Sequence, residues 1–159
     1  MNQVLSDIVF HLNQAFHITP ILYASFALEK VLGINLNAAD IDLLIPSSDF
    51  ERREHIISYF QSMGYQYQRD EVIHLMKDHI SIELADEDVW LDALKINRDT
   101  LHLINDHDHS YQLLGASNLL KLYQYLSQLS HRSEEKRSKD IQKIKIIKQA
   151  LDQDACRYR

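Results

Sequence analysis

Cysteine, glycine and proline are scarce in this chain, and each shortage excludes something. Of the 159 residues only Cys156 is a cysteine, which excludes an intramolecular disulfide framework and a cysteine-rich zinc site and favours an intracellular compartment. Three glycines and two prolines leave no flexible linker or low-complexity segment, and we find no internal repeat. Because 45% of the residues are hydrophobic, we expect one domain over 1–159 with a real core and a helical portion at 117–152.

Long apolar runs are also lacking. No stretch reaches membrane-spanning length, and residues 1–7 lack the basic start and apolar run of a signal peptide, so we expect a cytoplasmic protein without a membrane partner. The formal net charge of −6 argues against non-specific coating of nucleic acid. Residues 132–148 are the exception, with seven basic residues against three acidic ones. This segment is either a solvated helix face or an RNA-binding surface.

The hydrophobic spacing predicts alternating helices and strands. The expected helices cover 4–16, 25–32 (closed by Gly33), 47–63 (capped by Ser47 to Asp49), a segment starting at Ser117 and a segment starting at Ser133. The expected strands cover 21–24, 40–45, 65–68, 72–76 and 79–85, with another short one around 101–104. The predicted fold class is therefore α+β, with a small mixed β-sheet, flanking helices and a C-terminal helix pair. The leucines and aromatics of 119–129 also suggest a homodimer through these final helices.

Two aspartates in one short strand are the strongest chemical signal. Asp40 and Asp42 alternate with Ile41, so both carboxylates share a face, about 7 Å apart. Their repulsion is relieved by protonation, by solvent or by a shared divalent cation with oxygen ligands. Glu83, in the strand 79–85, is a third carboxylate.

A small residue followed by a hydroxyl stands at the start of the second helix. Ala24 and Ser25 end the first strand and open this helix, where backbone amides and the helix dipole favour a phosphate. The blander interpretation is that Ser25 only caps the helix. Likewise, Asp40, Asp42 and Glu83 have an alternative role as ordinary solvent-exposed strand carboxylates.

The order of strand, small-Ser turn, helix, Gly, loop, D-x-D strand, helix and later acidic strand resembles the minimal nucleotidyltransferase fold, the polymerase-β-like superfamily. The resemblance spans roughly 20–150. Within this superfamily, the chain more specifically resembles the branch that contains abortive-infection-type toxins and small antibiotic nucleotidyltransferases. Lys121 and the Lys139–Asp140 pair carry this second resemblance. Two departures are Ala24, where the family usually has glycine, and Glu83, where aspartate is common.

The resemblance implies a site and a reaction. Asp40 and Asp42 would bind Mg²⁺ on a nucleoside triphosphate, and Glu83 would complete a second metal position or take the proton from the attacking hydroxyl. Ala24 and Ser25 would form the phosphate turn, and Lys121 or Lys139 would steady phosphate charge.

The expected reaction is transfer of a nucleoside monophosphate to a hydroxyl or phosphate of a small molecule, a protein or a tRNA. Ala24 motivates an alternative, a non-catalytic binding or regulatory protein such as a toxin–antitoxin component. A separate alternative is that Lys139 and Asp140 are helix surface only.

The histidines give a weaker signal. His107 and His109 alternate with Asp106 and Asp108, a pattern that can chelate a metal. Zinc sites need three or four ligands in fixed geometry, and no partner motif stands elsewhere in the sequence. We therefore interpret 106–109 as a polar loop.

Overall fold

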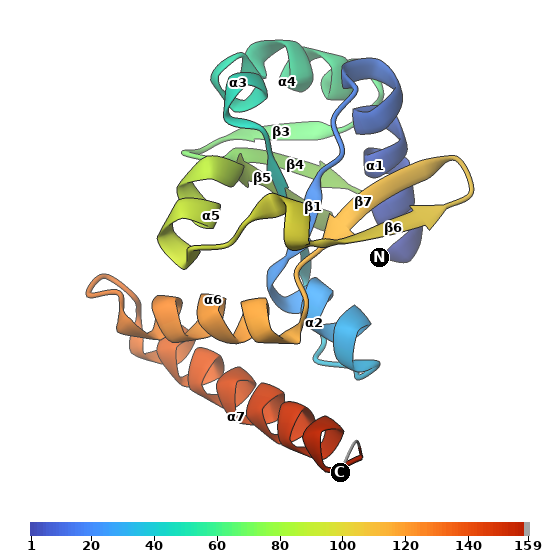
Figure 1. Ribbon diagram of the computed structural model, residues 1–159. Coiled ribbons are helices and arrows are strands. Elements are labelled where there is room, and N and C mark those ends of the chain that lie inside the picture. Colours follow the sequence, from blue (N-terminus) through green and yellow to red (C-terminus); the bar gives the residue numbers. More distant parts are fainter. Residues whose placement is uncertain (158–159) are drawn as a thin grey trace.

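A seven-stranded mixed sheet forms the centre of the computed structural model, which describes residues 1–157 (Figure 1). Its order is β3-β4-β5-β2-β1-β7-β6. The strands are β1 (Ile21–Tyr23), β2 (Asp40–Ile45), β3 (Gln66–Arg69), β4 (Ile73–Lys77), β5 (Ile80–Asp86), β6 (His102–Asp106) and β7 (His109–Leu113). The helices are α1 (Asn2–Phe16), α2 (Ala24–Leu32), α3 (Ser47–Glu51), α4 (Arg53–Ser62), α5 (Glu87–Leu94), α6 (Ala116–Gln128) and α7 (Glu134–Arg157), with a 3₁₀ turn η1 (Arg98–Thr100). The predicted fold class is confirmed.

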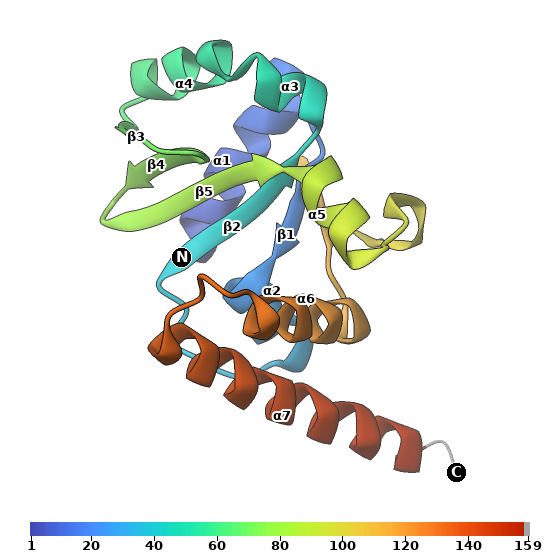
Figure 2. The same cartoon turned by 90° about the vertical axis from the view of Figure 1, so that its left-hand side faces the viewer.

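Helices cover both faces of this sheet. Figure 2 shows α1 behind the sheet and α5 in front of it, while α6 and α7 lie below the end at which β1 stops. The buried stripe of α1 repeats at helical spacing, as the sequence predicted; it consists of Val4, Leu5, Ile8, Val9 and Leu12. None of the helices within 1–157 combines the length and the apolar character needed to cross a membrane.

The centre of the sheet is β2, flanked by β5 on one side and β1 on the other. It runs parallel to β5 and antiparallel to β1. Ile41 and Leu43 are fully buried, so the D-x-D motif lies on a core strand whose alternate side chains anchor it. The strand boundaries at Asp40 and Ile45, and the end of α2 at Gly33, with φ of 65°, match the sequence-based prediction.

The third predicted helix is wrong in detail. It is two helices, broken at Arg52, and Pro46 rather than a serine is the N-cap of α3. The hydroxyl of Ser47 donates instead to Asp86 at the end of β5. The predicted Ser117 cap of α6 is also wrong, since Gly115 is its N-cap and no side chain caps it.

The segment between β5 and α6 contains β6, close to the strand predicted around 101–104, and three elements that the sequence did not predict, α5, η1 and β7. Asp86 is the N-cap of α5, and its side chain accepts a hydrogen bond from the Asp88 amide (3.0 Å). The predicted loop at 106–109 is the turn of the β6–β7 hairpin, and β7 pairs in parallel with β1. This hairpin extends the sheet by two strands beyond β1.

The two final helices pack against each other, as predicted. Asp140 on α7 is 1% exposed and accepts two hydrogen bonds from Arg132 in the α6–α7 loop (2.8 and 2.9 Å). Arg137 donates to the Leu129 carbonyl (3.0 Å). These contacts fix the position of α7 relative to α6. The side chain of Cys156 lies outside the described part.

Candidate active site

Three predicted carboxylates share one face of the sheet. Asp42 and Glu83 are direct register partners in the parallel β2–β5 pair, and Asp40 pairs with Ser81. Paired residues on adjacent strands point to the same side, and Asp40 stands two residues before Asp42. The structure therefore brings Asp40, Asp42 and Glu83 together, and we call them the acidic cluster.

Burial and mutual repulsion set the charge of the acidic cluster. Asp42 is 9% exposed; burial, followed by the charges of Asp40 and Glu83, raises its pKa well above the ordinary value. Burial and Asp40 also raise the pKa of Glu83, opposed by His74 and Lys136. The nearby positive charges therefore do not fully neutralise the negative charges of these carboxylates, and a bound cation would stabilise the charged forms.

The loop before β2 is held from α2. Glu29 Oε1 accepts hydrogen bonds from the amides of Leu36 and Ala38, both at 2.8 Å. A charged acceptor satisfies two backbone donors of a loop that has no other regular structure. Asp40 follows this loop directly, so the position of the acidic cluster is tied to α2.

The predicted phosphate turn lies where β1 meets α2. Ala24 has a φ of 61°, a left-handed conformation in which a Cβ is strained. Ser25 does not cap the helix, because Tyr23 is the N-cap and no side chain caps it. Ser25 Oγ instead accepts a hydrogen bond from Lys143 Nζ at 2.7 Å. The capping interpretation of Ser25 is therefore wrong.

Because the backbone at Ala24 is strained, we predict that a glycine at this position stabilises the protein. We expect Ala24→Gly to raise the free energy of unfolding by about 0.5–1 kcal/mol, because relief of the left-handed conformation outweighs the added entropy of glycine in the unfolded chain. Urea denaturation measures it. Ala150→Gly, within α7, is the control and should destabilise by roughly 0.5–1 kcal/mol. A loss of stability in Ala24→Gly would contradict the strain.

Lys143 is the cation at this turn, and the sequence analysis missed it. Its ammonium lies over the Tyr123 ring, 4.9 Å from the centroid. Burial lowers the pKa of Lys143, while the charges of Asp140 and Asp40 raise it. The Tyr123 hydroxyl is buried and lies beside Ser25. A phosphate oxygen at this place would meet the Lys143 ammonium.

The spacing along α7 contained a signal for Lys143. Among the residues 134–155 of this helix, Asp140 and Ile147 are the buried positions. Lys143 stands between them at i+3 and i−4, on the same face. A polar residue that stands three or four positions from the buried residues of a helix is expected to point in the same direction as they do. Lys136, two turns before Lys143 on this face, carries a charge that lowers the pKa of Glu83.

The two lysines that the resemblance suggested lie elsewhere. Lys121 is exposed on α6, about 200° around the helix from the buried Tyr123. Lys139 is largely exposed and its Nζ pairs with Glu135 Oε1 at 2.6 Å. The structure therefore brings Lys143, rather than either of them, to Ser25.

The side chains of the acidic cluster are oxygen donors of the kind that bind Mg²⁺. In the described range 1–157, no three His, Cys, Asp or Glu side chains are grouped so that they could hold a metal as they stand. By chemistry, however, the cluster fits Mg²⁺, since all three side chains offer oxygen ligands, and burial together with their repulsion raises the pKa of Asp42. Asp40, Asp42 and Glu83 are the residues that would hold it.

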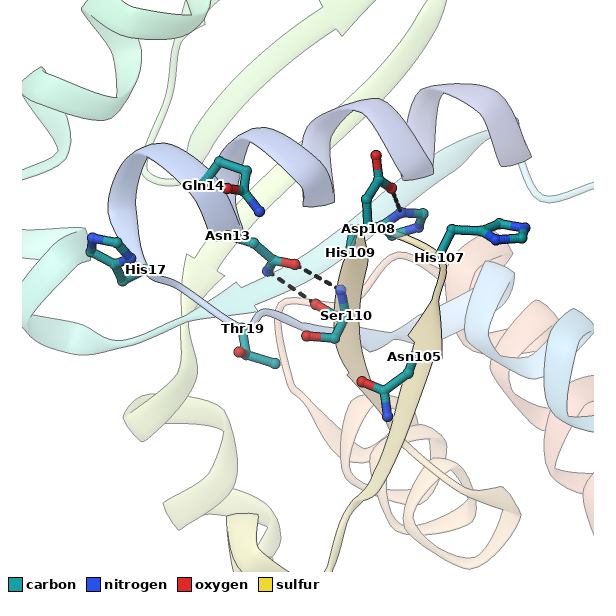
Figure 3. Close-up of a pocket in the computed structure, with 9 residues that line it drawn as sticks. All are labelled: Asn13, Gln14, His17, Thr19, Asn105, His107, Asp108, His109 and Ser110. Atoms are coloured by element: carbon teal, nitrogen blue, oxygen red, sulfur yellow. Dashed lines mark hydrogen bonds and ion pairs between the residues drawn. The ribbon is translucent and has the colours of Figure 1, made fainter.

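The segment 106–109, with His107 and His109, lies at the opposite end of β1 from the acidic cluster. A cavity of about 360 Å³ opens between the end of α1 and the β6–β7 turn (Figure 3). Asn13 exchanges two hydrogen bonds with the backbone of Ser110 (2.7 and 3.0 Å), and His109 Nδ1 lies 3.1 Å from Asp108 Oδ1. The hydrogen bonds of Asn13 tie the hairpin to α1, whereas the His109–Asp108 contact lies within the hairpin turn.

Comparisons with known proteins define the class of fold. No family model matches the sequence. An antigenic nucleotidyltransferase-like protein from Paracoccidioides brasiliensis has a TM-score of 0.60 at 17% identity, over 90% of this chain and 74% of its own. The lincosamide antibiotic adenylyltransferase LnuA gives 0.57 at 14%, over 92% and 98%. ANT(2")-Ia, in complex with adenylyl-2"-tobramycin, gives 0.56 at 12%, over 95% and 90%. The chain has the nucleotidyltransferase fold.

At the level of sequence, the chain is similar to the uncharacterized protein YnaI of Bacillus subtilis (strain 168). The two are 28% identical over 144 residues, which cover 87% of this chain and 90% of the relative. The likeness therefore extends over nearly the whole length of both proteins.

Proposed function

We propose that this protein transfers a nucleoside monophosphate from a nucleoside triphosphate to a hydroxyl group, with Mg²⁺ at Asp40, Asp42 and Glu83. One observation carries the proposal: the acidic cluster lies on one face of the sheet, beside a strained turn whose Ser25 accepts a hydrogen bond from Lys143. The adenylyltransferases LnuA and ANT(2")-Ia, which share the fold, support a small-molecule acceptor.

The positions of the side chains give each a role. Mg²⁺, when bound, supplies charge neutralisation of the triphosphate oxygens. Ser25 and Lys143, on the β1 side of Asp42, bind the phosphates that leave as pyrophosphate. Glu83, on the β5 side, accepts the proton of the attacking hydroxyl.

The transfer itself needs alignment more than covalent chemistry. The bond from the acceptor oxygen to the α-phosphorus forms as the bond to the pyrophosphate oxygen breaks, and the acceptor proton passes to Glu83. Glu83 and Ser25 lie on opposite flanks of Asp42 because β5 and β1 flank β2. This arrangement suits an in-line displacement.

A non-catalytic nucleotide-binding or regulatory protein is the second candidate. Ala24 favours it, since its Cβ stands in the phosphate turn at a φ of 61°, where glycine would let a phosphate approach the backbone more closely. Such a protein would bind a nucleoside triphosphate without releasing pyrophosphate.

Calorimetric titration with ATP, GTP, CTP and UTP, with and without MgCl₂, tests the proposal. We expect at least one nucleotide to bind only with Mg²⁺, and Asp40→Asn to weaken that binding roughly 10-fold or more through the lost charge. Asp92→Asn, an exposed aspartate on α5, is the matched control and should bind normally.

Pyrophosphate release, measured with a panel of hydroxyl-bearing acceptors, then separates the two candidates. Release that requires the acidic cluster supports the transferase, whereas binding without release over the panel supports the regulatory protein. If no nucleotide binds in the presence of Mg²⁺, both candidates are wrong.

A further inference from the structure

A row of three aromatic side chains leads from the acidic cluster to the protein surface. Tyr23 and Trp90 have ring centroids 5.6 Å apart, and Trp90 and Tyr125 lie 6.3 Å apart edge to face. Tyr23 is buried, Trp90 is half-buried and Tyr125 is 39% exposed. We call these three residues the aromatic row. It joins three separate elements, β1, α5 and α6.

The inner end of the aromatic row borders the acidic cluster. Tyr23 is the register partner of Asp42 in the β1–β2 pair, so its side chain lies on the same face. Burial and the charges of Asp42 and Glu83 raise the pKa of Tyr23, as expected for a phenol close to both carboxylates. A ligand held at the acidic cluster therefore has Tyr23, then Trp90, beside it.

The geometry of the transfer decides which part of a substrate would lie along the aromatic row. In-line attack places the acceptor and the leaving pyrophosphate on opposite sides of the α-phosphorus. Glu83 on β5 marks the acceptor side, and Ser25 after β1 marks the pyrophosphate side. The nucleoside is the third substituent of that phosphorus and must leave the axis between them. The aromatic row runs from Tyr23, beside the cluster, to Trp90 on α5 and Tyr125 on α6.

We propose that the aromatic row binds the base of the nucleoside triphosphate, which stacks on Trp90 with Tyr125 at the outer edge. This inference rests on the proposed function. Stacking on aromatic rings tolerates any base, because every base has a π-face, and its preferences follow stacking strength. The larger ring system of a purine covers more of an indole, so ATP and GTP bind more tightly than CTP and UTP.

Trp90 is the only tryptophan in the chain, so its fluorescence reports on this site alone. We expect ATP with Mg²⁺ to quench it and inorganic tripolyphosphate with Mg²⁺ to leave it nearly unchanged. By calorimetry, Trp90→Ala and Tyr125→Ala each weaken ATP binding about 10-fold and leave tripolyphosphate binding unchanged. Trp90→Phe keeps most of the affinity. Tyr67→Ala, on the far edge strand β3, is the control.

Each outcome distinguishes the inference from the proposed function. If wild-type protein binds ATP and both alanine variants bind it equally well, the aromatic row only packs α5 against α6, and the inference is wrong while the proposed function stands. Equal weakening of ATP and tripolyphosphate also overturns it, because the base would then not be the group in contact. If wild-type protein binds no nucleotide, both fail. If Trp90→Ala is too unstable to measure, Tyr125→Ala still tests the inference, because Tyr125 is exposed and its truncation should leave the fold intact.

Discussion

Asp42→Asn is expected to give a more stable protein that no longer performs the proposed transfer. Burial and the neighbouring carboxylates raise the pKa of Asp42 in the folded state. Between the ordinary carboxyl pKa and this raised value, the folded protein binds more protons than the unfolded chain, so stability falls as pH rises through that window. Asparagine carries no charge and removes this loss. It also removes a metal ligand, for which we expect turnover to fall roughly 100-fold or more.

Thermal melting of wild-type protein and Asp42→Asn between pH 4 and pH 8 checks the stability part. The variant should melt higher at pH 8, and the difference should shrink toward pH 4, where the wild-type carboxyl is protonated. MgCl₂ should stabilise only the wild-type protein, because a ligand that binds the native state raises its stability. A variant that melts lower at every pH would show that Asp42 serves packing rather than charge.

Lys143→Met is expected to weaken nucleoside triphosphate binding roughly 10- to 100-fold, the range for loss of a hydrogen bond to a charged group. Methionine keeps the length and apolar stem of the side chain but removes the ammonium that contacts Ser25. The fold should remain intact, since burying an ammonium without a carboxylate partner contributes little stability. Calorimetry with ATP and tripolyphosphate should show the same loss for both ligands, because the contact is to phosphate.

Lys139→Met is the matched control, one helical turn earlier on α7. Lys139 is exposed and paired with Glu135, so its replacement should change binding less than about 2-fold, as for other surface ion pairs. A larger effect for Lys139→Met than for Lys143→Met would favour the sequence resemblance over the geometry. Circular dichroism of both variants verifies that α7 is still formed.

The elements with strong local signals were predictable from the sequence. Strand β2 is bounded by a polar loop and Pro46, and α2 ends at Gly33, which adopts the left-handed conformation that glycine favours. The alternation in β5 places Glu83 on the face opposite Ile82 and Leu84. That alternation, with the pairing of β2 and β5, is why the acidic cluster could be anticipated. Its roles in metal binding and catalysis stay predictions.

What the sequence did not predict depends on contacts between distant segments. Strand β7 forms because it pairs with β1, with the Gln112 amide donating to the Pro20 carbonyl at 2.8 Å, and its own residues alternate only weakly. Helix α5 is short and rich in acids, although Asp86 at its start is a recognisable N-cap. Lys143 lies 118 residues from Ser25, and no local pattern encodes that pairing.

Because Lys143 follows Ser25 by 118 residues, the two residues emerge from the ribosome at different times during synthesis. All seven strands are complete once residue 113 has emerged, and domains begin to fold from their N-terminal part during synthesis. The nascent sheet could therefore carry its three acids for some time before the ammonium arrives with α7. Competence for the triphosphate would then be acquired only after residue 143 has emerged, so the nascent sheet alone would not sequester nucleotides.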